Sequence, residues 1–343
     1  MEKVERDRNA LEPKVCIIIL AYDSASKLGI QFIQNLLSSI KMQKYINYNI
    51  VVVDNGSRDD TAHIFEKIIK ELGIPGTVIK LRKNYGWAGG NNRGAIYCKN
   101  SDYLFFLNDD VLLMNDNVLS ILVTYFENTK NVGAAQPIIV SRDRSFSYGF
   151  KLGFAGFMEI INRPEEIISY VSGAALFTRT QLFFKLGMFD EDLFLYHDDV
   201  DYSLRVWIAG YENAVVKDTY IFHLGGASVT SDKSWYYVIR NNFLVMSKVS
   251  NAKYLHLKFA LIFMEFLVSW LWYSIYRSKD PNKAKAAIKG FIHGVLYYLP
   301  LGIKKRKYIF RRISETILLR NNIYDIKLDI NRIMPFIIKL LSK

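Results

Sequence analysis

Short hydrophobic runs alternate with longer amphipathic stretches along the first part of the chain. The short runs lie at 15–20, 49–53, 77–81 and 102–108. Apolar runs of this length bounded by turn residues indicate buried strands, and strands that alternate with helices indicate a parallel sheet covered by helices. The stretches between them predict three helices: one ends at about Lys44, one begins near Asp59 and one spans about 88–100. The pattern therefore predicts an α/β domain.

The next part of the chain has a mixed pattern. It predicts strands near 134–140 and 166–172 and a helical stretch from Thr180 to Gly210. The predicted catalytic domain covers residues 1–250. We expect it to divide into a first half at about 15–111 and a second half at about 112–250.

Residues 251–343 form a different, predominantly helical region. The stretch 258–277 is strongly apolar, with Glu265 as the one charged residue between its basic ends. An eighteen-residue helix spans about 27 Å, which is marginal for a bilayer core of roughly 30 Å. The segment 282–299 mixes lysines with apolar residues, and 304–313 is a basic amphipathic pattern. We expect helices that lie on a membrane, although this apolar tail could instead pack against a second copy of the chain.

Net charge separates the two regions. Residues 251–343 hold 18 Lys and Arg against 5 Asp and Glu, whereas residues 1–250 hold 27 against 28. A nucleic-acid enzyme usually places basic residues around its catalytic groove, so the distribution favours an anionic membrane surface over nucleic acid as the partner of the tail. Cys16 and Cys98 are the only cysteines. With no CxxC pair and no secretory signal, we expect both to be reduced core residues.

Two strand-to-helix junctions carry candidate ligand-binding residues. In VVVDNGSRDDT (51–61) an apolar strand ends at Asp54 before an Asn-Gly turn. This is either an ordinary junction or a site where Asp54 accepts the imide N–H of a pyrimidine. LRKNYGWAGGNNRGA (81–95) holds four glycines and three asparagines, which favours close backbone approach to a polar ligand. It matches neither the dinucleotide fingerprint nor the P-loop.

Acidic residues mark the other candidate sites. In LFFLNDDV (104–111) the strand ends at adjacent carboxylates, whose repulsion a divalent cation bound to a diphosphate would relieve. The segment 187–211 places three aspartates at the start of an amphipathic helix. They either stabilise the helix dipole or include a general base for a reaction. His223 follows a strand and precedes two glycines, which suits either a structural or a ligand role.

Taken together, these motifs resemble family 2 glycosyltransferases of the GT-A fold, and within them the rhamnosyltransferase-like group. The motifs that match in order are IIILAYDS (17–24), VVVDNGSRDDT (51–61), NYGWAGGNNRG (84–94), LNDDV (107–111), SGAALFTR (172–179), FDEDLFLYHDDVDYSLR (189–205), FHLGGAS (222–228) and RNN (240–242). The resemblance runs from about Val15 to Ser250. It implies a Rossmann-like mixed sheet flanked by helices, followed here by the membrane-associating region.

The resemblance implies roles for individual residues. Tyr22 and Asp54 would hold the nucleobase, and a further set would line the nucleotide-sugar pocket: Asn84, Gly89 and Gly90. Asp110 would be the principal ligand of Mg²⁺ or Mn²⁺, with Asp109 nearby on the ribose or the metal, and His223 would reach the metal or the diphosphate.

The resemblance also implies the base of the reaction. The family's usual Glu-Asp pair stands here as Asp198-Asp199, and Asp199 would be the base. The shorter Asp198 leaves the division of labour between the two carboxylates open. No role is assigned to Arg240 and Asn241.

The expected reaction is an inverting transfer of a sugar from dTDP-rhamnose or a UDP-hexose to an acceptor hydroxyl. The acceptor would be a glycan or a lipid-linked intermediate at the cytoplasmic face of the cell membrane. A nucleotidyltransferase would also use a metal and a nucleotide, but AYDSAS (21–26) lacks the glycine-rich basic first loop that such enzymes usually have. The other alternative is a catalytically inactive, membrane-associated sugar-binding scaffold.

Overall fold

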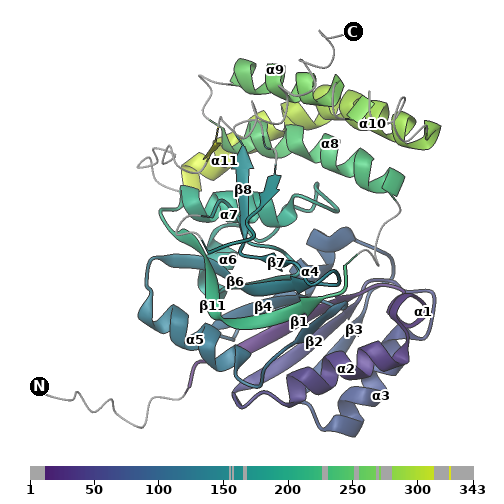
Figure 1. Cartoon of the computed structure of the whole chain (residues 1–343), viewed down its shortest axis with the longest axis vertical. Helices are drawn as coiled ribbons and strands as arrows, with labels where there is room; N and C mark the ends of the chain where they lie inside the picture. The colour runs from purple at the N-terminus through teal and green to yellow at the C-terminus, as the bar shows by residue number, and fades with distance from the viewer. Residues whose placement is uncertain are drawn as a thin grey trace, which may run out of the picture.

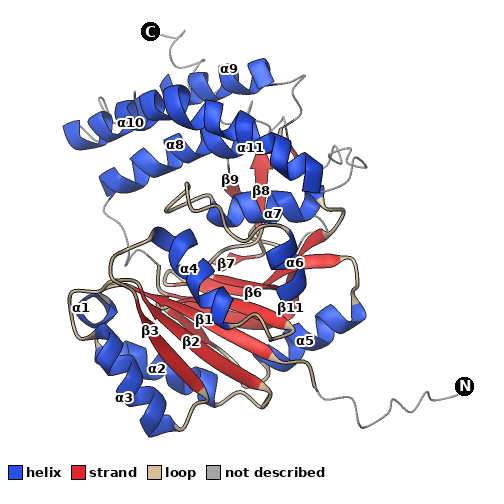
Figure 2. Ribbon diagram, turned by 180° about the vertical axis from the view of Figure 1, so that it is seen from behind, coloured by secondary structure: helices blue, strands red, loops and turns tan. Residues whose placement is uncertain are grey.

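The computed structural model shows a large mixed sheet with helices on both faces and a helical layer at one end (Figures 1 and 2). It describes residues 12–153, 156, 158–164, 168–225, 231–250, 255–267, 270–271, 280–312 and 324–325. The α/β architecture predicted from the hydrophobic pattern is therefore present.

The large sheet contains β1 (Val15–Ala21), β2 (Tyr48–Asp54), β3 (Gly76–Lys80), β4 (Tyr103–Asn108), β5 (Val111–Leu113), β6 (Val132–Ser141), β7 (Phe146–Ser147), β10 (Ala175–Arg179) and β11 (Glu212–His223). A small sheet contains β8 (Phe150–Gly153), β9 (Met158–Ile160) and β12 (Tyr324–Asp325). The large sheet has the order β3-β2-β1-β4-β10-β6-β11-β5, with β7 beside β6. Strands β1 to β4 are parallel, whereas β10 is antiparallel to both of its neighbours.

The helices are α1 (Ser24–Leu28), α2 (Ile30–Lys41), α3 (Thr61–Leu72), α4 (Gly86–Tyr97), α5 (Val118–Asn128), α6 (Thr180–Lys185), α7 (Asp198–Ile208), α8 (Ser231–Val249), α9 (Leu255–Glu265), α10 (Pro281–His293) and α11 (Leu299–Arg312). A π-helical turn, Gly294–Tyr298, joins α10 to α11.

Alternate residues of the central strands face opposite sides of the sheet, as the period of a strand requires. Ile17 and Ile19 pack into the core formed with α2, α3 and α5. Cys16 and Ile18 pack into the core formed with α4, α6 and α7. Both faces of β1 are buried, which explains why its sequence is a continuous apolar run.

The structure corrects two predicted elements. The stretch from Thr180 to Gly210 is not one helix, because residues 186–197 form a loop between α6 and α7. Several residues of this loop have positive φ, which a right-handed helix cannot accommodate. The strand expected at 166–172 is instead β10, which begins at Ala175; within the described residues, Tyr170 makes only an isolated bridge to Phe150.

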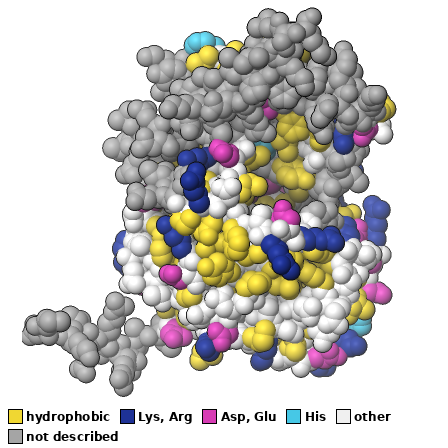
Figure 3. Space-filling view, in the orientation of Figure 1, with side chains coloured by type: hydrophobic (Ala, Val, Ile, Leu, Met, Phe, Trp, Pro, Cys, Tyr) yellow, Lys and Arg dark blue, Asp and Glu magenta, His cyan; other side chains and the backbone are white. Residues whose placement is uncertain are grey.

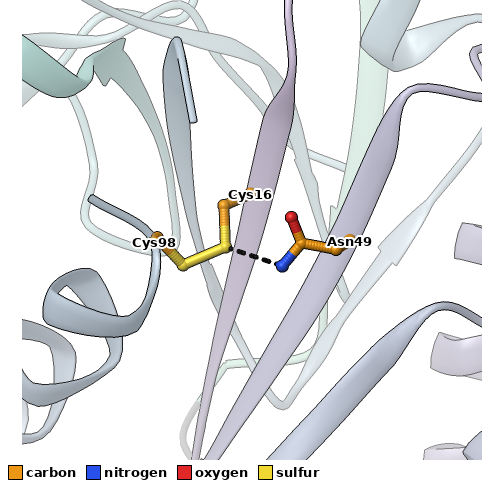
Figure 4. Close-up of a disulfide and its surroundings, with 3 residues drawn as sticks. All are labelled: Cys16, Asn49 and Cys98. Carbon is orange, nitrogen blue, oxygen red and sulfur yellow. Dashed lines mark hydrogen bonds between the residues drawn. A yellow bond between two sulfur atoms is a disulfide. The ribbon is translucent and has the colours of Figure 1, made fainter. Parts of the chain in front are cut away.

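Cys16 and Cys98 are joined in a disulfide, so the expectation of two reduced thiols was wrong (Figure 4). Cys16 lies on β1, and Cys98 follows the end of α4, at a sequence separation of 82. The side chain of Asn49 on β2 donates a hydrogen bond to Cys16 Sγ at 3.3 Å. Because both cysteines are buried residues of neighbouring elements, tertiary packing brings together two thiols whose spacing in the sequence carried no pairing signal.

Helices α8 to α11 form a layer beyond α7, at the end of the molecule away from α2 and α3 (Figure 1). Helix α8 packs on α10 and α11 and also contacts α7, so the layer rests on the helix that carries the predicted base. Among the described residues, one continuous helix, Pro281–Arg306, is long and apolar enough to cross a membrane, by length and composition alone. The expected span 259–276 lies partly outside the described residues.

On the described part of one face of the molecule, acidic and basic side chains are interspersed around a central hydrophobic area (Figure 3). Neither sign gathers into one large patch there. This distribution agrees with the nearly balanced charge of residues 1–250.

Candidate active site

The carboxyl ends of three parallel strands meet at one edge of the sheet. Ala21 of β1 lies opposite Asp54 of β2, and Leu20 lies opposite Asn108 of β4. The residues that follow these strands, including Tyr22 and Asp109, are therefore brought to the same edge. This is where open α/β sheets bind their ligands.

Tyr22 and Asp54 lie in the first two loops of this edge. The backbone N–H of Ser57 donates to Asp54 Oδ1 at 3.0 Å, so the carboxylate fixes the turn that follows β2. Lys27 Nζ donates to the carbonyl of Tyr22 at 2.6 Å and lies 4.4 Å from the centre of its ring. The two residues predicted to hold a nucleobase thus belong to loops of defined conformation.

An amide network shapes the turn before α4. Asn55 Oδ1 accepts from the N–H of Tyr85, and Asn55 Nδ2 donates to the carbonyl of Gly86 and to Asn84 Oδ1. Asn84 Oδ1 also accepts from the N–H of Gly86 at 2.7 Å. Gly86 has φ +76°, and a Cβ there would lie 2.1 Å from the carbonyl oxygen of Phe194. Glycine is therefore needed at this position for two independent reasons.

The next glycines of α4 are explained by packing. A Cβ on Gly90 would lie 2.3 Å from Leu20 Cδ1, and one on Gly94 would lie 2.5 Å from Ile18 Cγ2. Gly89 lies under Tyr85 and beside Arg93. Gly90 and Gly94 let α4 approach β1 closely. The structure thus gives a packing reason for glycines that the sequence alone associated with close approach of a ligand.

Asp109 follows β4 and faces the first loop. Ser24 Oγ donates a hydrogen bond to Asp109 Oδ2. Burial, together with the nearby Asp110 carboxylate, raises the pKa of Asp109 to about 7, against the lowering effect of the Ser24 hydrogen bond. The site therefore contains a carboxylate whose charged form is poorly stabilised by the protein itself.

Asp110 and His223 come together from β4 and the end of β11. His223 pairs with Val111 in the sheet, and Asp110 Oδ1 lies 3.2 Å from His223 Nε2. Asp110 is 2 % exposed, yet its Oδ1 accepts no aligned hydrogen bond from any described residue. A buried carboxylate oxygen with unused acceptor capacity beside an imidazole nitrogen is a pair of donor atoms that fits a divalent cation.

Two protein ligands are fewer than a closed metal site needs. Within the described ranges no third His, Cys, Asp or Glu completes a metal-binding group. Divalent cations that act on nucleotides usually take one or two carboxylates and fill the remaining positions with water and phosphate oxygens. The geometry is therefore suited to a cation that arrives with a diphosphate.

Gly173 connects Asp199 to this edge of the sheet. Its N–H donates to Asp199 Oδ2 at 2.9 Å. The neighbouring carbonyl of Ala174 accepts from the N–H of Asn108, immediately before Asp109. Trp87 completes the link, because its Nε1 donates to Asn108 Oδ1 at 2.9 Å and its ring lies against Gly173. The start of β10 thus lies between the acidic end of β4 and the acidic start of α7.

The two acidic residues at the start of α7 lie in different environments. Asp198 is 3 % exposed, and burial with the adjacent Asp199 carboxylate raises its pKa well above the usual range. Asp199 is partly exposed and accepts backbone hydrogen bonds from Gly173 and Val200. Its partial burial raises its pKa, and these hydrogen bonds oppose the rise. Asp201 is buried and paired with Arg205 and Lys248. Asp199 is thus the carboxylate of this cluster that is accessible.

The structure brings the predicted residues to one edge of the sheet by hydrogen bonds and strand register. Sequence reasoning missed the residues that connect them: Ser24, Asn55, Trp87, Asn108 and Gly173. All five lie inside motifs that the sequence singled out. Their roles depend on contacts between segments far apart in the chain, which the motifs alone do not specify.

The sequence of this chain is similar to known proteins over most of the α/β region. A model of the glycosyl transferase family 2 matches residues 16–193, more than half of the 343 residues. The dTDP-rhamnosyl transferase RfbF of Shigella flexneri is 28% identical over 237 residues, which cover 63% of this chain and 76% of that protein. The O-antigen chain rhamnosyltransferase WbaN of Salmonella anatum is 24% identical over 184 residues, covering 51% and 56%.

Solved structures share the fold. GalNAc-T7 with UDP, GalNAc and Mn²⁺ has a TM-score of 0.62 at 14% identity, over 97% of this chain and 58% of that one. The mannosyltransferase PcManGT from Pyrobaculum calidifontis with GDP-Man and Mn²⁺ has a TM-score of 0.54 at 16% identity, over 88% and 86%. The predicted GT-A fold is confirmed.

Proposed function

The chain belongs to glycosyl transferase family 2, and we propose that it is an inverting rhamnosyltransferase that uses dTDP-rhamnose. Two relatives named as rhamnosyltransferases, one of them for dTDP-rhamnose, support this donor over a UDP-hexose. The acceptor is a hydroxyl of a glycan or of a lipid-linked intermediate in cell-surface glycan assembly. Its place of action is the cytoplasmic face of the cell membrane.

One observation carries the proposal: the contact of Asp199 with Gly173 at the start of β10. That contact places an accessible carboxylate beside the strand that borders Asp109 and Asp110. A transfer reaction needs a group that stabilises the leaving diphosphate and a base for the incoming hydroxyl. The two acidic segments supply these from separate parts of the chain.

At the donor side, Asp110 and His223 would hold a divalent cation, for which Mn²⁺ in two structural relatives gives the first candidate and Mg²⁺ the second. When bound, the cation supplies positive charge to the diphosphate as it leaves. Asp109 lies next to this pair and binds the ribose or the same cation. A nearby positive charge favours the ionised form of Asp109 and offsets the burial that raises its pKa.

The nucleotide lies over the loops that follow β1 and β2. Tyr22 packs on the base, and Asp54 accepts its imide N–H. The sugar lies towards the turn before α4, where Asn84 and the first turn of the helix, with Gly89 and Gly90, form the wall of the pocket. The support for this placement is the strand register, which brings these loops together at the carboxyl edge of the sheet.

At the acceptor side, Asp199 removes the proton from the attacking hydroxyl. The hydroxyl oxygen forms a bond to the anomeric carbon as the bond from that carbon to the diphosphate breaks. A single displacement of this kind inverts the anomeric configuration. Burial raises the pKa of Asp199, which strengthens the carboxylate as a base at neutral pH.

Asp198 is not the base in this proposal. It is buried, and burial favours its neutral form. We assign it a supporting role behind Asp199, and this is our proposal for the division of labour that the sequence left open.

The helical layer attaches the enzyme to an anionic membrane. Exposed apolar residues recur along α10, the π-helical turn that follows it and α11, at Ile288, Ile292, Leu296 and Ile303. Exposed lysines, including Lys289 and Lys304, lie on the same helices. An apolar stripe accompanied by basic residues suits the interface of a bilayer that carries anionic lipid.

The first experiment is a calorimetric titration of dTDP and UDP into the full chain, with and without Mn²⁺. We expect dTDP to bind more tightly in the presence of Mn²⁺ and the metal-dependent gain to be lost in Asp110→Ala. The matched control is Asp116→Ala, since Asp116 is exposed and pairs only with Lys44 among the described residues. Equal binding by wild type and Asp110→Ala would rule out the assigned metal ligand, and tighter binding of UDP would overturn the choice of donor.

A further inference from the structure

The segment that leads into α7 has an unusual backbone. Phe194, Tyr196 and His197 all have φ between 64° and 66°, and none of them is glycine. Residues with a Cβ rarely adopt this region, and such conformations persist when surrounding contacts determine them. The contacts that hold residues 192–197 therefore also fix where Asp198 and Asp199 begin the helix.

Two adjacent side chains of α8 donate five hydrogen bonds to backbone carbonyls of this segment. Asn241 Nδ2 donates to the carbonyls of Leu193 at 3.0 Å, Leu195 at 2.8 Å and Tyr196 at 2.8 Å. Arg240 Nη2 donates to the carbonyls of Asp192 and Leu193 at 3.0 and 2.6 Å. The two side chains are joined by Arg240 Nε, which donates to Asn241 Oδ1 at 2.8 Å.

Both side chains are buried, with Arg240 5 % and Asn241 0 % exposed. The guanidinium carbon of Arg240 also lies 4.2 Å from the centre of the Tyr298 ring and 4.8 Å from that of Tyr237. A buried carbonyl that loses its donor and cannot reach water carries a free-energy penalty. Removal of either side chain would therefore release the backbone from this conformation.

The opposite side of the segment contacts the donor half of the site. The carbonyl of Phe194 accepts from the N–H of Trp87 at 2.6 Å. Trp87 in turn lies on Gly173, whose N–H holds Asp199. The segment is therefore fixed between α8 and the first turn of α4. A shift of α8 would move both this first turn and Asp199.

We propose that Arg240 and Asn241 are positioning residues that hold the Asp199 carboxylate in register with the donor site. This inference rests on the proposed function, because Asp199 is the base of that reaction. Neither residue touches the reacting atoms. Both act through the backbone of residues 192–197, so their loss displaces the base while the loops after β1 and β2 keep their conformation.

Ion pairs to the same helical layer support this role. Lys248 of α8 lies 2.6 Å from Asp190 and 2.5 Å from Asp201 of α7. Lys305 of α11 lies 2.5 Å from Asp190 and also pairs with Asp192. The helical layer therefore holds the loop before α7 at several successive points.

The test compares Asn241→Ala and Arg240→Lys with Ser247→Ala. Ser247 is a matched control because it is buried on the same helix, and among the described residues it donates only to carbonyls of α8 itself, those of Phe243 and Leu244. Arg240→Lys keeps the charge but loses the planar arrangement of donors. It provides a milder variant should Asn241→Ala fail to fold.

Three quantities are measured: the affinity for dTDP with Mn²⁺, the rate at which dTDP-rhamnose is hydrolysed to rhamnose and dTDP with water in place of the acceptor, and backbone hydrogen exchange. We expect turnover to fall about 10- to 100-fold in Asn241→Ala and Arg240→Lys, because a displaced catalytic group lowers the rate of the chemical step. The affinity for dTDP should be unchanged. Exchange should rise at Trp87 and over residues 193–201. Ser247→Ala should match wild type in all three quantities.

Two results would overturn the proposal. One is unchanged turnover in a folded variant whose exchange rises over residues 193–201. The other is a rise in exchange spread evenly over the chain, with affinity and turnover falling together, which would indicate a purely structural role. Absence of nucleotide binding and turnover in wild type would refute the proposed function instead. In that case the exchange pattern alone would decide whether Arg240 and Asn241 hold residues 192–197.

Discussion

At the scale of single residues, the two adjacent carboxylates at the start of α7 are distinguished by burial. Asp198 is enclosed, whereas Asp199 is partly exposed and held by the N–H of Gly173. Both residues are aspartates, and they are adjacent in the sequence. Their different surroundings therefore decide which of them can meet a substrate.

We expect Asp199→Asn to lower turnover by about 10²- to 10⁴-fold, the usual contribution of a general base, with dTDP affinity nearly unchanged. Asp198→Asn should retain most of the activity, because an amide resembles the neutral acid that burial favours at this position. Steady-state kinetics and calorimetry on both variants measure these effects. A larger loss of turnover in Asp198→Asn than in Asp199→Asn would reverse the assignment.

The same burial predicts a dependence of stability on pH. The folded state raises the pKa of Asp198, so the unfolded chain loses this proton first as pH rises above about 4. The free energy of unfolding therefore falls with rising pH, by up to about 1.4 kcal/mol per pH unit, until pH passes the pKa in the folded state.

Asp198→Asn removes this group and should flatten the profile above about pH 4. Because Asp109 and Asp199, whose pKa values are also raised, remain in the variant, the difference between the two profiles isolates Asp198. Urea denaturation at a series of pH values measures it. Parallel profiles for wild type and variant would contradict the expected burial of a neutral acid.

At the scale of elements, the first turn of α4 packs against the loop before α7. Gly86 lets the two backbones meet, since a Cβ at this position would lie 2.1 Å from the carbonyl oxygen of Phe194. The N–H of Trp87 donates to the same oxygen. A donor-side element and a base-side element are thus joined at one point of close backbone contact.

We expect Gly86→Ala to lower both the stability of the protein and its turnover. Gly29→Ala is the matched control, because Gly29 has φ +82° but no atom within 4 Å of an added Cβ. The control should lose about 1 kcal/mol or somewhat more of unfolding free energy from backbone strain alone. Gly86→Ala should lose more, since it must also move Phe194. Equal losses in thermal or urea denaturation would show that close approach is unimportant there.

At the scale of the whole molecule, the helical layer has two sides with different character. One side packs on α7 and the loop before it through α8 and α11. The other exposes apolar and basic residues of α10 and α11. A layer that binds a membrane on one side and positions the base on the other would present the active site to a lipid-linked acceptor. The division of the chain at residue 250 remains a prediction, because α8 packs with the helices that follow it.

We expect the full chain to float with vesicles that contain anionic lipid and to bind less as salt is raised. Leu296→Asp, which places a charge in the exposed apolar stripe, should weaken this binding. Ile46→Asp is the matched control, since Ile46 is 81% exposed but lies between α2 and β2, outside the helical layer. Equal flotation of the Leu296 variant and wild type, or no flotation of wild type, would contradict the membrane surface proposed here.

The sequence by itself determined the first four strands, the α/β class and the motifs that resemble a glycosyltransferase family. Buried parallel strands produce continuous apolar runs, and the polar residues that end those runs are short-range features of the chain. The predicted positions of Asp54, Asp110 and Asp199 follow from such local patterns. These residues lie where strands or helices begin and end, as expected.

Only the tertiary structure decided how these segments meet. The clamp of Arg240 and Asn241 on residues 192–197, the contact of Gly173 with Asp199, and the pairing of Cys16 with Cys98 all join residues far apart in the sequence. The break between α6 and α7 has the same origin, because residues with positive φ are held there by side chains of α8 and by Trp87. Local propensity favours a helix through this stretch, and long-range hydrogen bonds to buried carbonyls override it.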